Sequence, residues 1–129
     1  KKLIFPFTVI MSDCNYLKKV NDQFGHEYGD KVLQRIVAVL KEQCPEGGYV
    51  CRYGGDEFIT FFPHATPANT NEYVQKVQEL LGKERIEVSM GTKLTQPGDG
   101  ESLDDYLALA DERMYQQKRQ RKEQSHDAQ

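Results

Sequence analysis

The chain has 129 residues, of which 38% are hydrophobic and 29% charged, and its formal net charge is −3. This composition predicts one globular domain over residues 1–129, and no apolar run approaches the roughly 20 residues of a membrane span. The negative charge provides no basic surface, so we expect neither a nucleic-acid partner nor a membrane contact from this segment.

The first half of the chain predicts a strand followed by two helices. An apolar run over residues 3–11 predicts a buried strand, which ends beside Asp13. Apolar residues then recur at helical spacing over residues 17–24, and Gly25 stands where the C-terminal glycine of a helix belongs. A second helix has its apolar stripe over residues 32–40 and is stopped by Pro45, Gly47 and Gly48.

Two strands with a glycine pair between them come next. Residues 49–53 and 58–62 are rich in β-branched and aromatic side chains, which favours strands. Gly54 and Gly55 predict a two-residue hairpin, because both glycines tolerate a positive φ, and they let a ligand approach the backbone closely. The pattern therefore predicts a turn whose backbone a ligand can contact.

The second half of the chain predicts one more helix, strand and helix. A polar loop is expected over residues 63–71, a helix over 73–82, a strand over 85–94 and a helix that begins after Ser102. The order of the elements predicts an α+β fold with a ferredoxin-like βαββαβ core, like a nucleotide cyclase or polymerase palm, and with additional helices.

Two acids mark the ends of neighbouring strands in this expected fold. Asp13 closes the first strand and Asp56 follows the glycine turn, directly before Glu57. In a ferredoxin-like sheet these strands are adjacent, so the carboxylates can converge and bind a hard divalent cation together with a substrate phosphate. Asp13 also directly precedes the first helix, so it is equally a candidate for a helix N-cap.

The segment between these acids resembles the GGDEF domain, the catalytic domain of diguanylate cyclases, and the resemblance covers essentially the entire chain. The family pattern is D-x-D-x-F-K-x-x-N-D-x-x-G-H-x-x-G-D, then R-x-G-G-D/E-E-F, an S-x-G strand and an A-D-x-A-L-Y-x-A-K helix. The matching residues here are Asp13, Lys18, Asn21, Asp22, Gly25, His26, Gly29, Asp30, the block Arg52 to Phe58, Ser89, Gly91, Ala110, Asp111, Tyr115 and Lys118.

The resemblance implies a function and a role for each matching position. It implies a domain that condenses two GTP into cyclic di-GMP as a homodimer, with Mg²⁺ or Mn²⁺ as cofactor and an upstream sensor or regulatory domain as partner. The implied metal and catalytic residues are Asp13, Asp56 and Glu57, with the carbonyl of Cys14 as a further metal ligand. The implied substrate-binding residues are Asn21 and Asp30 for guanine, Lys18, Lys118 and Lys122 for phosphate, and the Gly54 and Gly55 turn.

The sequence departs from the family pattern at several positions. Asn15 replaces the second Asp of D-x-D and Leu17 replaces the usual Phe. The inhibitory R-x-x-D motif is replaced by Pro45-Glu46-Gly47-Gly48, so that site is expected to be absent. The segment over residues 63–84 is shorter than usual, which predicts a trimmed helix or a lost edge hairpin.

Two other functions remain open on the sequence. One is a catalytically silent GGDEF domain that serves as a GTP-binding or protein-interaction module, against which the intact acids argue. The other is a cyclase that joins adenine and guanine nucleotides, against which the intact Asp30 argues.

The cysteines and the start of the chain give expectations about its setting. Cys14, Cys44 and Cys51 are an odd number without ligand spacing, which favours reduced thiols in the cytoplasm over disulfides or a zinc site. There is no initiator methionine and the chain starts on a strand, so we expect a domain cut from a longer multidomain protein. The cytoplasmic assignment also holds for a cytoplasmic domain of a membrane-anchored protein.

Overall fold

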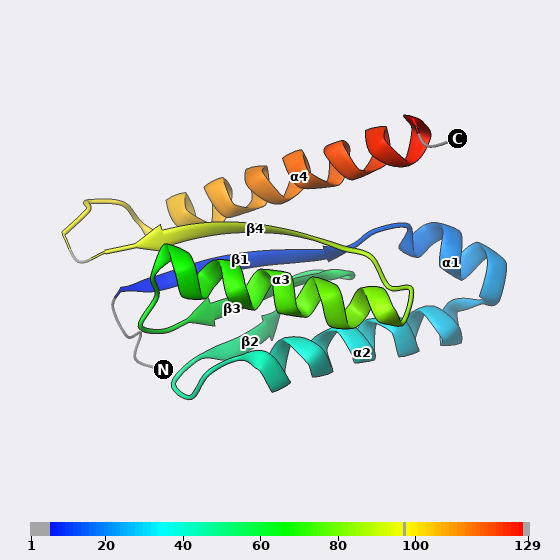
Figure 1. Cartoon of the computed structure of the whole chain (residues 1–129), viewed down its shortest axis with the longest axis horizontal. Coiled ribbons are helices and arrows are strands. Elements are labelled where there is room, and N and C mark those ends of the chain that lie inside the picture. Colours follow the sequence, from blue (N-terminus) through cyan, green and yellow to red (C-terminus); the bar gives the residue numbers. More distant parts are fainter. Residues whose placement is uncertain (1–5, 97, 128–129) are drawn as a thin grey trace.

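A four-stranded antiparallel sheet lies at the centre of the chain (Figure 1). The computed structural model describes residues 6–96 and 98–127, with side chains described as far as Arg121. The strand order is β2-β3-β1-β4, and the predicted ferredoxin-like βαββαβ core is confirmed. In chain order the elements are β1 (Phe7–Cys14), α1 (Leu17–Phe24), α2 (His26–Gln43), β2 (Tyr49–Arg52), β3 (Glu57–Phe62), α3 (Pro67–Lys83), β4 (Val88–Thr95) and α4 (Leu103–Asp127).

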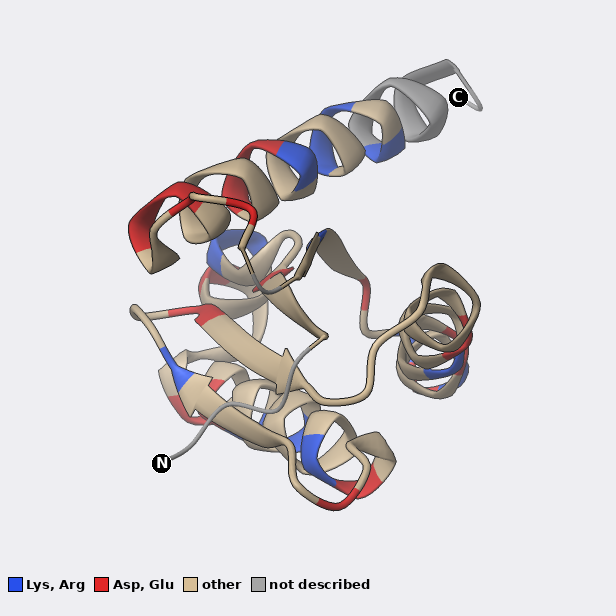
Figure 2. Ribbon diagram, turned by 90° about the vertical axis from the view of Figure 1, so that its left-hand side faces the viewer, with Lys and Arg blue, Asp and Glu red and all other residues tan. Residues whose placement is uncertain are grey.

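The two faces of the sheet are covered by different helices. Helices α2 and α3 pack on one face, against strand side chains such as Ile10 and Phe58. Helix α4 packs on the other face, where it covers Val9 and Met11, and Figure 2 shows it on the opposite side of the sheet from α2. Side chains alternate along β1, so Asp13 falls on the α4 face with Val9 and Met11. This register places an acid under the helix that carries Lys118.

Strand β1 ends later than the sequence predicted. The structure places it over Phe7–Cys14, and residues 3–5 of the predicted strand lie outside the described residues. Asp13 therefore lies within β1 and is not a helix cap, because Tyr16 holds the N-cap position of α1. Strand β4 likewise begins at Val88 and not at residue 85, because Arg85 adopts a positive φ of 62° in a turn.

The predicted loop over residues 63–71 is partly wrong, because α3 already begins at Pro67. The Thr66 hydroxyl accepts from the amide of Asn69, and the Asn69 side chain accepts from the amide of Thr66. This reciprocal capping box, with a proline in the first turn, starts a helix in a polar stretch that has no apolar periodicity. Ser102 and Asp105 form the same arrangement before α4, as the sequence predicted for Ser102.

Gly91 allows α4 to lie directly on β4. A β-carbon on Gly91 would stand 2.0 Å from the carbonyl oxygen of Ala110 and 2.3 Å from the amide nitrogen of Met114. No side chain fits in that space, so the helix backbone contacts the strand backbone. Gly91 therefore sets the height of α4 above the sheet.

Cys14, Cys44 and Cys51 are not joined in disulfides. Among the described residues, none of the helices combines the length and apolarity that a bilayer crossing requires.

Candidate active site

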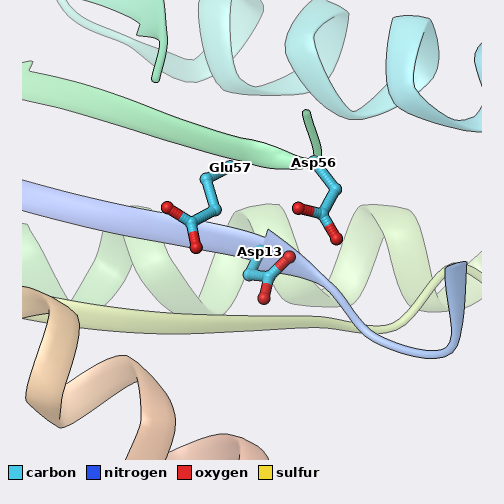
Figure 3. A group of neighbouring side chains, drawn as sticks. All are labelled: Asp13, Asp56 and Glu57. Carbon is cyan, nitrogen blue, oxygen red and sulfur yellow. The ribbon is translucent and has the colours of Figure 1, made fainter. Parts of the chain in front are cut away.

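Three carboxylates meet where β1 ends and β3 begins (Figure 3). Asp13 and Glu57 are directly opposite each other in the register of the two strands, and Asp56 is the residue before β3. One carboxylate oxygen from each residue lies within 4.8 Å of the others. The convergence that the sequence predicted for Asp13 and Asp56 is thus present, and Glu57 joins it.

Lys118 provides the positive charge closest to this acid cluster. Its Nζ donates to Oδ2 of Asp13 over 2.9 Å, although the two residues are 105 positions apart in the chain. Asp13 is 4% exposed, and within the described part of the chain its Oδ1 has no hydrogen-bond partner. One oxygen of a buried carboxylate therefore points into the cluster without a ligand.

The electrostatics of the cluster follow from burial and crowding of like charges. Burial raises the pKa of Asp13, against the hydrogen bond from Lys118, and Asp56 raises it further. Burial also raises the pKa of Glu57, with contributions from Asp111, Asp13 and Asp56. Burial lowers the pKa of Lys118, but its contacts with Asp13 and the charge of Asp56 outweigh this, and the net shift is upward. The cluster is thus short of positive charge.

The turn before β3 differs from the predicted two-residue hairpin. Four residues, Tyr53 to Asp56, connect the strands, and neither Gly54 nor Gly55 adopts a positive φ. The loop closes because the amide of Tyr53 donates to the Glu57 carbonyl over 2.9 Å, and because the Arg52 guanidinium donates to the carbonyls of both glycines. No atom lies within 4 Å of a β-carbon placed on Gly55, so the loop leaves open space over its backbone.

The two residues predicted for guanine lie on either side of the junction between α1 and α2. Gly25 joins the helices with a φ of 92°, as the sequence predicted, and its amide donates to the Asn21 carbonyl over 2.8 Å. Oδ1 of Asn21 is buried against Gly29 and has no partner among the described residues. Asp30 is exposed and lines a cavity of about 310 Å³ together with Leu33, Gln34, Val37, Arg52 and Phe58.

The predicted phosphate-binding lysines lie in different settings. Lys18 is exposed on α1, whereas Lys118 is partly buried at the acid cluster. The structure places the backbone of Lys122 in α4, but its side chain lies outside the described residues. Of the two lysines whose side chains are described, Lys118 is the one that contacts the carboxylates.

A polar network next to the acid cluster was not found from the sequence. Ser89 donates to Oδ1 of Asn15 over 3.0 Å, and the Asn15 amide donates to Glu87 over 3.3 Å. Arg121 donates to the other oxygen of Glu87, also over 3.3 Å. The partners are more than 30 positions apart in the chain, so no spacing in the sequence could reveal them.

Comparison with known proteins decides the family. The family model described as "Diguanylate cyclase, GGDEF domain" matches residues 3–124. The chain belongs to the GGDEF family. The four-stranded antiparallel sheet with four helices is the GGDEF fold, and the family uses a divalent metal.

The relatives include diguanylate cyclases at modest identity. The response regulator PleD of Caulobacter vibrioides is 31% identical over 124 residues, which cover 88% of this chain and 27% of PleD. The diguanylate cyclase VdcA of Vibrio cholerae is 29% identical over 121 residues, which cover 86% of this chain and 36% of VdcA. This GGDEF domain therefore spans about a quarter to a third of the length of these relatives.

Solved GGDEF structures confirm the architecture. The GGDEF domain of DgcB from Caulobacter crescentus, solved in complex with c-di-GMP, superposes with a TM-score of 0.81 at 25% identity, covering 88% of this chain and 72% of that one. An EAL/GGDEF domain protein from M. capsulatus superposes with a TM-score of 0.81 at 27% identity, covering 92% of this chain and 84% of that one. The fold extends over almost all of the described chain.

The acid cluster of this GGDEF domain fits a divalent cation. Mg²⁺ prefers one or two carboxylates and retains several waters, and Ca²⁺-sized ions accept more oxygens. Three carboxylates within 4.8 Å, one with an unpartnered buried oxygen, supply the oxygen ligands and the negative charge that such a cation needs. The replacement of the second Asp of D-x-D by Asn15 does not disturb this, because Asn15 bonds Ser89 and Glu87 outside the cluster.

Proposed function

We propose that this domain is a diguanylate cyclase domain, which condenses two GTP into cyclic di-GMP and releases pyrophosphate. The 3′-hydroxyl of one GTP attacks the α-phosphate of the other and pyrophosphate leaves, and a second, symmetric attack closes the ring and releases a second pyrophosphate. The observation that carries the proposal is the cluster of Asp13, Asp56 and Glu57 beside Lys118 at one end of the sheet.

The acids would hold the metal ions. Asp13, Asp56 and Glu57 offer carboxylate oxygens, and the carbonyl of Cys14 continues the same strand end as a further ligand. When bound, divalent cations stabilise the attacking and leaving oxygens of an in-line displacement. The paired strands β1 and β3 would hold the carboxylate oxygens at a constant spacing during the reaction.

The lysines would hold the triphosphate. Lys118 has three N–H donors, and the described structure uses one of them on Asp13. If a cation were bound at Asp13, Lys118 would be free to donate to the phosphates instead of to the Asp13 carboxylate. We propose that Lys18 on α1 and Lys122 on α4 supply further positive charge for the phosphates.

Guanine selection would rest on Asn21 and Asp30. The guanine edge presents both donors and acceptors, which an amide and a carboxylate complement. The cavity of about 310 Å³ beside Asp30 has apolar walls from Leu33 and Phe58 that suit a planar base. Oδ1 of Asn21 has no hydrogen-bond partner among the described residues, and we propose that the Asn21 amide bonds the guanine edge.

Catalysis would require two copies of the domain. One domain holds one GTP, and the attacking hydroxyl belongs to the GTP of the second domain. We therefore propose a homodimer with its two sites face to face about a two-fold axis, formed under the control of an upstream sensor or regulatory domain.

The test is a forced dimer, made by fusing the chain to a two-stranded coiled coil. Incubation with GTP and Mg²⁺ or Mn²⁺ is expected to give cyclic di-GMP, identified by mass spectrometry. Asp56→Ala is expected to abolish the product without loss of the fold, because substitutions of such surface acids usually change stability by within about ±0.5 kcal/mol. Glu112→Gln, at an exposed acid on α4 away from the cluster, is the matched control.

Two outcomes would contradict the proposal. If the wild-type dimer binds GTP by calorimetry but forms no product, the domain is a GTP-binding module without cyclase activity. If Asp56→Ala forms product at the wild-type rate, the acid cluster is not the catalytic site.

A further inference from the structure

A second, larger cavity lies on the reverse side of α2 from Asp30. Its volume is about 540 Å³, and its walls are formed by α1, α2, the connection from α3 to β4, and Cys14 and Asn15 where β1 ends. Figure 1 shows α1 and this connection at the same end of the molecule. The α2 residues that line it, Tyr28, Lys31, Val32 and Arg35, are offset by about half a helical turn from Asp30 and Leu33, which line the smaller cavity. We call it the rear cavity.

The walls of the rear cavity carry aromatic surface that nothing in the described chain covers. Phe24 is 57% exposed and Tyr28 is 49% exposed, and their ring centroids lie 4.9 Å apart. Helix α1 has no buried residue, although Val20 and Phe24 are apolar. An apolar ring placed in the cavity would bury surface on both aromatic side chains and on α1.

The charges around the rear cavity leave an excess of positive charge. Glu84 is neutralised by Arg35, whose Nε lies 2.7 Å from it. Glu87 is neutralised by Arg121 at 3.3 Å. Lys31 and Arg85 also line the cavity, and neither forms an ion pair within the described part of the chain.

A turn holds the main chain of one of these cations beside the cavity. Arg85 has a positive φ of 62°, and its amide donates to the Gly82 carbonyl over 3.0 Å in the turn that ends α3. The turn holds Arg85 beside the cavity at Ile86 and Glu87, which continue the same wall. An anion that binds here would therefore contact an arginine whose backbone is already ordered.

We propose that the rear cavity is a binding site for a small aromatic anion. Its planar ring packs against Phe24 and Tyr28, and its carboxylate, sulfonate or phosphate group binds Lys31 and Arg85. The volume of about 540 Å³ suits a ligand of drug size, since such pockets span roughly 300–1,000 Å³. The site does not depend on the cyclase reaction. If the proposed function holds, a ligand against Val20 and Phe24 also steadies the helix that carries Asn21.

The experiment compares two fluorescent probes that share a ring system and differ in charge. The anionic probe is 8-anilinonaphthalene-1-sulfonate and the neutral one is N-phenyl-1-naphthylamine, each titrated into the full chain without GTP or metal. We expect the sulfonate to saturate one site. The double variant Lys31→Gln/Arg85→Gln is expected to weaken the sulfonate about tenfold, or about 1.4 kcal/mol, and to leave the neutral probe unchanged.

Three further variants distinguish binding in the rear cavity from non-specific binding of the probes elsewhere on the protein. Phe24→Ala removes half of the aromatic wall and is expected to weaken both probes. The charge-matched double variant Lys41→Gln/Lys76→Gln changes exposed lysines elsewhere on α2 and α3 and is expected to change neither. If Lys31→Gln/Arg85→Gln does not fold, as judged by circular dichroism, Arg85→Gln alone makes the same comparison.

Hydrogen exchange locates the bound sulfonate. We expect added protection in residues 17–24 and 84–87 and none in the loop over residues 53–56. The proposal is wrong if wild-type protein does not bind the sulfonate, if both double variants weaken it equally, or if the protection appears only outside the rear cavity.

Discussion

Asn21 and Gly29 fit each other so closely that Oδ1 of Asn21 lies 1.7 Å from the point where a β-carbon on Gly29 would stand. The family pattern has a glycine directly before the acid that corresponds to Asp30, and this contact gives the physical reason for it here. Any side chain at residue 29 would push the Asn21 amide away from its place between α1 and α2.

We therefore predict that Gly29→Ala weakens GTP binding as much as Asn21→Ala does. The reason is steric displacement of the amide, and not loss of helix, because alanine is the better helix former by about 1 kcal/mol. Calorimetric titration of GTP and thermal unfolding of the same variants check this. Unchanged GTP affinity in Gly29→Ala would remove Asn21 from the guanine site.

Asp30 is expected to set the choice of base. Asp30→Ala should weaken GTP binding more than ATP binding, because a site with polar groups for one base penalises a base that leaves them unpaired. Titration of both nucleotides into wild type and variant measures the difference. Equal losses for GTP and ATP would show that Asp30 has a structural role only.

Gly91 and Gly82 should respond in opposite directions to the same substitution. Gly91→Ala forces a methyl group into the backbone of α4 and is expected to lower the free energy of unfolding by about 1–3 kcal/mol or more. Gly82→Ala, within α3 and with no atom inside 4 Å of the added carbon, should raise it by about 0.5–1 kcal/mol. Urea unfolding measures both, and a stable Gly91→Ala would mean that α4 does not rest on β4 as described.

Glu57 is expected to destabilise the metal-free fold. It lies opposite Asp13, and like charges directly opposite across two strands cost roughly 0.2–1 kcal/mol. Burial and the neighbouring acids raise the pKa of Glu57 in the folded state. As pH rises, the Glu57 carboxyl therefore loses its proton at a lower pH in the unfolded chain than in the folded one. The destabilisation that Glu57 causes is therefore absent below the pKa of Glu57 in the unfolded chain. It grows as pH rises above that value and reaches its full size above the pKa of Glu57 in the folded domain.

Glu57→Gln in EDTA should thus raise the free energy of unfolding at neutral pH and leave it unchanged in acid. The same variant should lose the stabilisation that Mg²⁺ or Mn²⁺ gives the wild type. Unfolding curves at several pH values, with and without metal, test both statements. Glu112→Gln is again the control, and a destabilised Glu57→Gln in EDTA would contradict the electrostatic account of the cluster.

Cyclic di-GMP is not expected to be a tight non-competitive inhibitor. Pro45 and Gly48 stand where the family has the Arg and Asp of its inhibitory site, so no fork for phosphate and no carboxylate for the base are present. The structure adds that a β-carbon on Gly48 would stand 2.7 Å from the Phe61 carbonyl oxygen, so an Asp does not fit there without movement of β3. Initial rates at saturating GTP with increasing cyclic di-GMP test this, and sub-micromolar inhibition insensitive to GTP would reveal another inhibitory surface.

The sequence predicted the parts of this domain that depend on local patterns. Apolar periodicity located α2 and α4, and Gly25 located the boundary between α1 and α2. The acid cluster was predicted because strand order follows from the order of the elements, which brings Asp13 beside residues 56 and 57.

Other features could not be read from such patterns. Thr66 and Asn69 cap α3 through reciprocal side-chain bonds, which overrides the polar character of the stretch. The turn at Gly54 and Gly55 is closed by the side chain of Arg52, and so it is longer than a glycine pair alone predicts. The pairing of Lys118 with Asp13 depends on how α4 lies on the sheet, which Gly91 decides through contacts that have no signature in the chain.

Strand β1 is the first strand of this domain to be synthesised, but its pairing in the sheet is complete only when β4 has been made. It lies between β3 and β4, and the Thr95 hydroxyl bonds the Phe7 carbonyl across 88 positions of the chain. A polypeptide leaving the ribosome therefore presents this strand, all of whose residues are buried in the folded domain, long before either neighbouring strand exists. Contacts of such long range slow folding. Until α4 has emerged, Asp13 of β1 also lacks its ion-pair partner Lys118. The nascent domain should for this reason depend on chaperones during synthesis more than its small size suggests.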